Sequence, residues 1–194
     1  MRFALLAILM GLTFPVVAAP PTSAPATKPL EKQKVKLFNG SVRIFLPSDW
    51  QTSDVAQDGM TGKFIMPDGK SYVVVNVSQQ DRTLSKRAAQ VVKMTVIEGL
   101  NKQFAEQHTE VLTPPTYEQD DRFFTRIHDR IKVEGQVLDE LHIFRMEGLN
   151  LLCITAVIFG DTPRSARPMQ KAAEDMALDI QVGYMDTKQV PKKK

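Results

Sequence analysis

Cysteine is almost absent from this sequence: Cys153 is the only one among 194 residues. A lone cysteine excludes an intrachain disulfide, so the hydrophobic core must supply the stability of the fold. Because Cys153 stands inside an apolar run at residues 151–154, we expect a small buried side chain with an unreactive thiol. Histidine is also scarce, with three residues in all.

Motifs that mark enzymes are missing as well. The sequence has no glycine-rich phosphate loop, no Gly-x-Ser-x-Gly nucleophile elbow and no His-Glu-x-x-His metal motif. Asp120 and Asp121 fall in an expected turn, and Glu174 and Asp175 fall on an expected helix surface, where a solvated charge is the ordinary situation. We therefore assign no catalytic residue and no cofactor, and an accessory or binding role is favoured over an enzyme.

The N-terminal stretch is typical of a secretory signal. Arg2 precedes an apolar run at residues 3–14, and small residues follow at 16–19. A run of about a dozen residues is too short to cross a bilayer core of about 30 Å as a helix. We expect a signal peptide at residues 1–19, cleaved after Ala18, Ala19 or Ala26, and a periplasmic or secreted protein; an uncleaved N-terminal anchor is the alternative.

Two further segments are expected to lie outside the fold. Residues 20–36 are rich in proline, alanine and lysine, a composition typical of an extended linker. Residues 187–194 form a basic tail whose lysines could make weak contacts with anionic surfaces. The remaining residues, 37–186, suit a single domain.

The positive charge of the chain belongs to these end segments. The sequence carries a net charge of +3, but nine basic residues and one acidic residue lie outside residues 37–186. The domain itself then holds 16 basic and 21 acidic residues, a net charge of −5. Because a nucleic-acid-binding domain needs a basic face, recognition of nucleic acid is disfavoured.

Runs of alternating and β-branched residues predict strands on both sides of one long helix. The strands before the helix are expected at residues 41–46, 62–66 and 71–79, and the turn sequence Pro67-Asp68-Gly69 links the last two. Those after it are expected at 109–112, 122–133, 137–147 and 149–159. The last of these runs is apolar at odd and even positions, so both of its faces must be covered.

Two helices complete the order of elements. Residues 84–107 repeat an apolar side chain every fourth residue from Ala88 to Phe104, which predicts one long amphipathic helix with Thr83 as its N-cap. A second helix is expected after Asp161, with Pro168 in its first turn, and a short last strand is expected at residues 178–182. Tight links impose antiparallel pairing. The predicted fold class is α+β, an antiparallel sheet flanked by helices.

Residues 41–183 resemble the PsbP-like superfamily of α/β/α sandwiches. The resemblance rests on Val-Arg-Ile-Phe-Leu-Pro-Ser-Asp-Trp at 42–50, on Tyr-Val-Val-Val-Asn-Val at 72–77, and on the long helix and the meander that ends in a helix. It implies a sheet between helices, partners that differ among members, and no shared catalytic residue. The exported DcrB-type envelope proteins are the most similar branch, although their lipid-modified cysteine is missing here.

A basic stripe is the first candidate site. Arg126, His128, Arg130 and Lys132 alternate along one face of the strand expected at 122–133 and form the only concentrated positive feature of an acidic domain. Such a stripe could bind an acidic protein partner. Alternatively, it is the outer face of a strand whose charges pair with Asp139 and Glu140.

A metal site is the second candidate. If residues 134–136 form a three-residue loop, Arg130 faces Glu140 and His128 faces His142, and two imidazoles beside a carboxylate could bind zinc or copper. A register shifted by two residues would instead set Glu140 opposite His128. An ordinary polar cluster is the favoured interpretation of His128, Glu140 and His142.

The sequence therefore favours an exported, non-catalytic accessory or protein-interaction domain of the bacterial cell envelope. Its partner is not identified by any motif. A small-ligand or metal carrier that uses His128, Glu140 and His142 is the alternative.

Overall fold

The computed structural model describes residues 32–37, 40–55, 61–79, 86–118 and 125–183. The expected signal peptide at 1–19, the expected N-cap Thr83 and the expected basic tail at 187–194 lie outside these residues. Within the described residues, neither helix is both long enough and apolar enough to cross a membrane.

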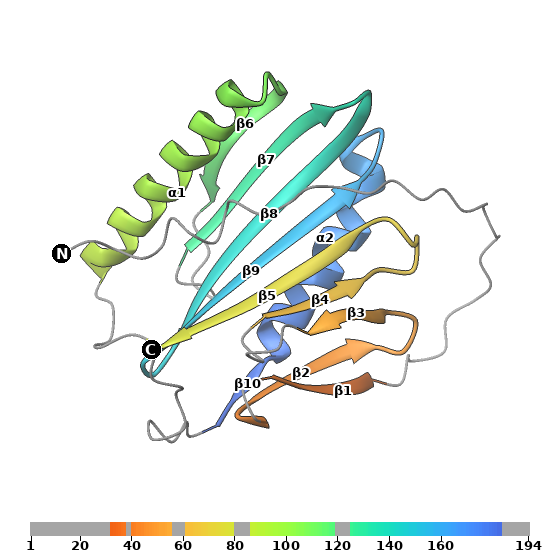
Figure 1. Cartoon of the computed structure of the whole chain (residues 1–194), viewed down its shortest axis with the longest axis vertical. Helices are drawn as coiled ribbons and strands as arrows, with labels where there is room; N and C mark the ends of the chain where they lie inside the picture. The colour runs from red at the N-terminus through yellow and green to blue at the C-terminus, as the bar shows by residue number, and fades with distance from the viewer. Residues whose placement is uncertain (1–31, 38–39, 56–60, 80–85, 119–124, 184–194) are drawn as a thin grey trace, which may run out of the picture.

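Seven antiparallel strands form the main sheet (Figure 1). In spatial order they are β3 (Gln51–Val55), β4 (Thr61–Ile65), β5 (Tyr72–Gln79), β9 (Asn150–Phe159), β8 (Gln136–Glu147), β7 (Thr125–Val133) and β6 (Glu110–Glu118). The predicted turn at Pro67-Asp68-Gly69 joins β4 to β5, and Asp68 Oδ1 accepts hydrogen bonds from the backbone N–H groups of Lys70 and Ser71. The tight links from β4 to β5, from β7 to β8 and from β8 to β9 impose antiparallel pairing on these strands, as predicted.

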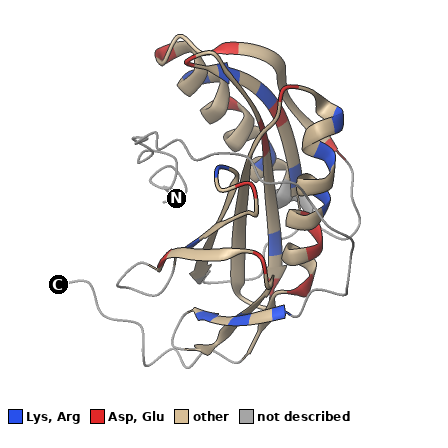
Figure 2. Cartoon of the chain, turned by 90° about the vertical axis from the view of Figure 1, so that its right-hand side faces the viewer, with Lys and Arg blue, Asp and Glu red and all other residues tan. Residues whose placement is uncertain are grey.

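The two helices pack on opposite faces of this sheet, which Figure 2 shows from its side. Helix α1 (Lys86–Glu106) packs on β6 and β7, and helix α2 (Pro163–Asp179) packs on β8, β9 and β2. Because strand residues alternate between faces, the central strand β9 supplies side chains to two separate cores. The predicted fold class, an antiparallel sheet flanked by helices, is confirmed.

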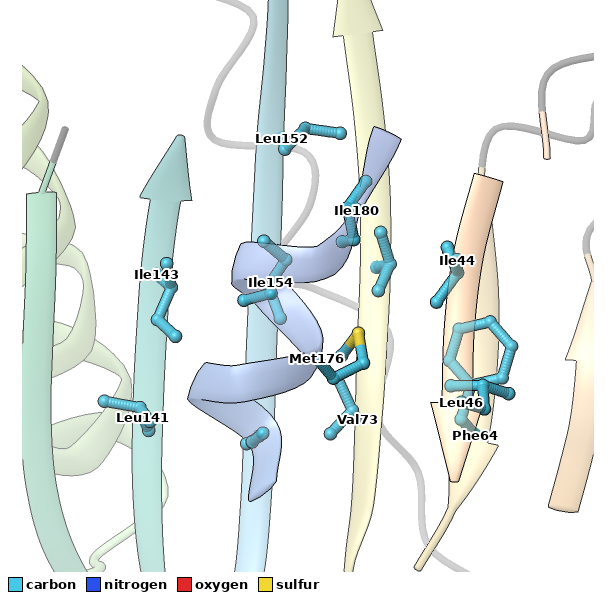
Figure 3. Packing of buried hydrophobic residues seen from close by; sticks show 14 of the residues in the cluster. Ile44, Leu46, Phe64, Val73, Leu141, Ile143, Leu152, Ile154, Met176 and Ile180 are labelled. Atoms are coloured by element: carbon cyan, nitrogen blue, oxygen red, sulfur yellow. The ribbon is translucent and has the colours of Figure 1, made fainter. Parts of the chain in front are cut away.

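The core on the α2 side is the larger of the two (Figure 3). Leu152 and Ile154 of β9 lie beside Met176 of α2 in this core. On the other face, Leu151, Cys153 and Val157 join α1 residues such as Leu100. The expectation that the apolar run at 149–159 is covered on both sides is therefore confirmed for β9, and the lone Cys153 is buried.

A second, three-stranded sheet closes one end of the domain. It has the order β1 (Lys32–Leu37), β2 (Val42–Pro47) and β10 (Gln181–Val182). Strand β1 begins inside the predicted linker at 20–36, which therefore ends earlier than predicted. The lysines of β1 alternate with Gln33, Val35 and Leu37, and the Gln33 amide donates hydrogen bonds to the backbone carbonyls of Pro47, Ser48 and Trp50.

Two edge strands differ from the prediction. Strand β3 was not expected, because its five residues are all exposed and show no apolar alternation. Strand β6 was expected to stop at residue 112 but continues through Pro114 and Pro115 to Glu118. Proline lacks an N–H group, and an edge strand tolerates it on the side that has no neighbour. The β6–β7 register shifts on both sides of Thr113, where the ladder adjusts to these prolines.

Helix α2 is held at both of its ends. Thr162 caps the N-terminus with its side chain and exchanges hydrogen bonds with Ser165. At the C-terminus, Arg145 Nη1 of β8 donates to the carbonyls of Ala177, Leu178 and Ile180, which the helix itself leaves without donors. Pro168 lies inside the helix, not in its first turn, because the helix already begins at Pro163.

Candidate functional site

The turn between β7 and β8 sets the geometry of the site. Val133 pairs with Gln136, so the hairpin loop contains only Glu134 and Gly135, and both adopt a positive φ, 50° and 81°. A two-residue loop with two positive φ values matches the right-handed twist of the flanking strands. The predicted three-residue loop is wrong, and the register differs by one residue from the predicted one.

A register shift of one residue changes which side chains of the two strands lie on the same face of the sheet. The observed pairs are Asp129 with Glu140, Ile127 with His142, His128 with Leu141 and Arg130 with Asp139. The predicted pairing of His128 with His142 is therefore wrong. His128 lies on the α2 face of the sheet, whereas Glu140 and His142 lie together on the α1 face.

On the α2 face, the buried charge of Asp139 is fully engaged. Arg130 Nη1 donates to Asp139 Oδ2 at 2.7 Å, and Arg130 Nη2 donates to the Gly160 carbonyl at 2.9 Å. His128 Nε2 lies 3.2 Å from Asp139 Oδ1 and 3.1 Å from the Gln170 amide of α2. These contacts form a closed polar network between the sheet and α2.

The basic stripe predicted for partner binding is thereby used within the chain. Besides His128 and Arg130, Arg126 forms ion pairs with Glu118 of β6 and Glu174 of α2, and Lys132 pairs with Glu110. The Arg130 side chain is buried, and only Lys132 keeps a substantial exposed fraction. A protein partner that bound this stripe would have to displace these internal carboxylates.

On the α1 face, three ionisable side chains converge without closing such a network. His142 Nε2 lies 3.6 Å from Asp129 Oδ2 and 3.7 Å from Glu140 Oε2, so neither separation is a hydrogen bond. Both oxygens of Asp129 and the Nε2 atom of His142 are buried and have no hydrogen-bond partner within the part of the chain that the structure describes. We call Asp129, Glu140 and His142 the α1-face cluster.

Two further polar side chains lie beside the α1-face cluster. His142 Nδ1 lies 3.2 Å from the hydroxyl of Thr155, the residue opposite it on β9. Tyr72 of β5 stands in the same row of the sheet as Glu140, with Val157 between them, and no other described residue forms a hydrogen bond with its buried hydroxyl. Lys63 Nζ lies 4.1 Å from the centre of the Tyr72 ring.

The electrostatics of the α1-face cluster are dominated by burial. Burial alone would lower the pKa of His142, but the Asp129 and Glu140 carboxylates outweigh it and raise that pKa to about 9. Burial also raises the pKa of Asp129; the His142 ring opposes this shift and the Glu140 charge adds to it. Two carboxylates share one imidazole, so negative charge is in excess.

The side chains at this site are suited to binding an ion. Burial raises the pKa of the Cys153 thiol to about 12, so the thiolate needed of a nucleophile does not form near neutral pH. Burial, together with the Glu140 charge, raises the pKa of the Tyr72 hydroxyl as well. The α1-face cluster instead offers two carboxylates and one imidazole, whose ligand atoms all lie within 4.8 Å of one another and could hold a metal ion.

The sequence prediction named two of the three cluster residues and missed Asp129. A usable signal was present, because Asp129 occupies the face of β7 that otherwise presents Ile127 and Ile131 to the core. A carboxylate at a core-facing position of an alternating strand is costly and therefore informative. Tyr72 gave no comparable signal, since tyrosine is common in strands.

Comparison with known proteins supports the fold. No family model and no curated protein matches the sequence. Among solved structures, cyanobacterial PsbP from Synechocystis sp. PCC 6803 matches with a TM-score of 0.52 and 15% identity, over 84% of this chain and 99% of that one. The Ran-binding protein Mog1p of Saccharomyces cerevisiae matches with a TM-score of 0.52 and 10% identity, over 79% and 96%.

A third match is a protein from Bacteroides thetaiotaomicron VPI-5482, with a TM-score of 0.50 and 10% identity, over 80% of this chain but 50% of that one. At these identities the matches establish architecture alone. The predicted similarity to DcrB-type proteins stays a prediction. The resemblance to the superfamily, however, is confirmed at the level of structure: the chain has a PsbP-like fold.

Proposed function

We propose that this protein is an exported, non-catalytic accessory domain of the bacterial cell envelope that binds a protein partner. Export is supported by the charged and apolar pattern of residues 1–19. A binding role is supported by the burial of Cys153 and by a structural neighbour that binds the protein Ran. The partner of this chain is expected to be a different protein, because fold likeness does not carry a partner over.

The observation that carries the proposal is the position of the exposed apolar side chains. Of the seven large hydrophobic residues that are exposed in the described part of the chain, five lie on α1 and β6, between 39% and 48% exposed: Val91, Met94, Val111, Leu112 and Tyr117. Exposed apolar side chains that gather on neighbouring elements are typical of protein-binding surfaces. We call these five residues the α1–β6 surface.

The two elements of this surface adjoin. Val91 and Met94 are three residues apart on α1 and therefore share one side of the helix. Lys93, between them in sequence, places its ammonium 4.0 Å from the centre of the Tyr117 ring of β6. The surface thus extends from the helix to the free edge of the sheet.

The edge itself favours a partner that binds through side chains. Strand β6 is the last strand of the sheet and pairs with no other described strand on its outer side, but Pro114 and Pro115 lack the N–H groups that an added strand would need. A partner is therefore expected to pack an apolar surface of its own on the α1–β6 surface. The basic stripe on β7 is not required for this contact.

A photo-crosslinking experiment tests the proposal. A photoreactive residue at Met94 should capture one discrete envelope protein, whereas the same residue at Thr52 on the opposite edge strand β3 should not. Val91→Glu combined with Leu112→Glu should abolish the crosslink without changing the circular dichroism spectrum. Equal capture from both positions, or none from Met94, would argue against the α1–β6 surface.

Export is tested separately. Fractionation of cells that express the full chain, followed by N-terminal sequencing, should give a mature protein that begins after Ala18, Ala19 or Ala26 and is released with the periplasmic fraction. Recovery of the intact N-terminus in the cytoplasm would refute export while leaving the binding surface to its own experiment.

A further inference from the structure

The α1-face cluster contains a buried charge that the protein does not satisfy. Asp129 is 0% exposed, and neither of its carboxylate oxygens receives a hydrogen bond from the described residues. A carboxylate buried in this way costs several kcal/mol in effective terms unless another group compensates it. Native structures leave very few such groups, and an unobserved ion is one of the ordinary explanations.

The spacing of the cluster matches a metal ion better than a set of hydrogen bonds. A hydrogen bond would bring His142 Nε2 within about 3.2 Å of a carboxylate oxygen. The two observed separations, 3.6 Å to Asp129 and 3.7 Å to Glu140, are longer. Two ligands bound tetrahedrally to Zn²⁺ at about 2.1 Å lie about 3.4 Å from each other. Small movements of the side chains would therefore bring all three ligand atoms to one ion.

The hydroxyl of Thr155 orients the His142 ring for metal binding. When the Nδ1–H group of His142 donates to the Thr155 hydroxyl, the Nε2 lone pair is left pointing at the carboxylates. A hydroxyl or carbonyl that fixes the second ring nitrogen is the usual support of a metal-binding histidine. Thr155 is in register with His142 on the adjacent strand, so the support is part of the rigid sheet.

Tyr72 is a further buried polar side chain beside the three ligands. Among the described residues its hydroxyl has no hydrogen-bond partner, although a buried tyrosine hydroxyl ordinarily finds one. Tyr72 stands in the row of Glu140 and Asp129 across four adjacent strands of the sheet.

From these observations we propose that Asp129, Glu140 and His142 bind one divalent transition-metal ion of the Zn²⁺ type. Two carboxylates and a neutral imidazole balance the charge of a divalent cation. One nitrogen and two oxygen ligands suit Zn²⁺, whereas Ca²⁺ requires six to eight oxygen ligands. The Glu140 side chain is 16% exposed and the other two are almost fully buried, so the ion would enter on the Glu140 side.

This site is distinct from the α1–β6 surface, and the two proposals can fail separately. The metal site uses residues of β7 and β8 that face the core, whereas the proposed protein-binding residues are exposed on α1 and β6. It also differs from the metal site predicted from the sequence, since His128 lies on the other face and Asp129 takes its place.

A zinc titration of the metal-stripped, tag-free full chain tests the proposal. Calorimetry should show one Zn²⁺ bound per chain, and Zn²⁺ should raise the melting temperature. His142→Gln and Asp129→Asn should each weaken binding by at least about 10-fold and remove the thermal shift. His128→Gln is the matched control, because it removes a histidine from the same hairpin but from the other face, and it should bind Zn²⁺ as the wild type does.

Two further measurements keep the test decisive if a ligand variant does not fold. Thr155→Val keeps all three ligands and should weaken Zn²⁺ binding by about 10-fold through loss of the His142 support. Co²⁺ added to the wild-type chain should give the visible absorption of a tetrahedral site, and Zn²⁺ should displace it. The proposal is overturned if the wild type binds no Zn²⁺, if His142→Gln binds it equally well, or if His128→Gln loses it to the same degree.

Discussion

The hairpin of β7 and β8 buries two aspartates in two different ways. Asp139 and Asp129 lie on opposite faces of the same pair of strands, and their side chains are 1% and 0% exposed. On the α2 face, Arg130 donates a hydrogen bond to Asp139, and His128 Nε2 lies 3.2 Å from the same carboxylate. On the α1 face, no described residue forms a hydrogen bond with Asp129. Equal burial therefore does not imply equal compensation, and the difference separates a structural ion pair from a candidate binding site.

The largest effect is expected from removing the charge of Asp139 on the α2 face. Asp139→Asn removes the charge that balances the buried Arg130 guanidinium, and the free energy of unfolding should fall by about 4 kcal/mol, since an uncompensated buried charge is left behind. Urea denaturation measures this loss. Asp175→Asn, at an exposed position on α2, is the control and should change stability by less than about 0.5 kcal/mol. Similar values for the two variants would contradict the role of the network.

The pH dependence of stability tests the charge interactions of His142 in the α1-face cluster. The pKa of His142 is raised in the folded metal-free protein to about 9, from an ordinary value of 6.5. The imidazolium therefore stabilises the fold fully below pH 6.5, and this contribution is lost as the pH rises through 9. It amounts to roughly 3 kcal/mol.

Urea denaturation of the wild type and of His142→Gln, both in EDTA, isolates this contribution. The stability difference between the two proteins should be largest at pH 6 and should shrink toward pH 10. A difference that stays constant, or that grows with pH, would show that the carboxylates do not hold the proton on His142.

A third variant tests the hydrogen bonds that Arg145 donates to the C-terminal end of α2. Arg145→Met keeps much of the side-chain volume but removes the donors to the carbonyls at the end of α2. The free energy of unfolding should fall by about 2 kcal/mol, because hydrogen bonds to a charged donor are lost. Arg164→Met, at an exposed position in the first turn of α2, should leave stability nearly unchanged. Equal losses would assign the effect to charge alone.

The smallest effect should have the opposite sign. In EDTA at pH 10, where His142 has lost its proton, Asp129→Asn removes excess negative charge from the α1 face, and the free energy of unfolding should rise by about 1 kcal/mol. The same substitution on the other face, Asp139→Asn, is the matched comparison and destabilises. If Asp129→Asn also destabilised the metal-free protein, Asp129 would be a structural ion pair like Asp139.

The sequence was sufficient for the architecture because the architecture depends on residue patterns. The apolar side chain at every fourth position of α1 requires one face of the helix to pack on a core. The apolar run of β9 requires cover on both faces of the strand, so together they indicate a sheet covered by helices. The edge strands were predicted less well: β3 was missed because it buries nothing, and β6 was predicted too short because two prolines interrupt its pattern.

The site could not be predicted because it depends on the length of one loop. Two-residue hairpin loops favour Asn-Gly or Asp-Gly, and here Glu134 takes the first position with a positive φ that glutamate rarely adopts. The residue types Glu-Gly-Gln do not distinguish a loop of two from a loop of three. That single residue decides whether His142 faces His128 or lies beside Asp129.

The small sheet of β1, β2 and β10 has a mechanical consequence. Strands β1 and β10 are both antiparallel to β2, so Lys32 lies opposite Pro47 at one end of β2 and Val182 lies opposite Val42 at the other. A force that pulled the two ends of the described chain apart would load the β1–β2 ladder along the strands, in shear. The hydrogen bonds between β1 and β2 would then have to break together, so this sheet would resist extension of the chain.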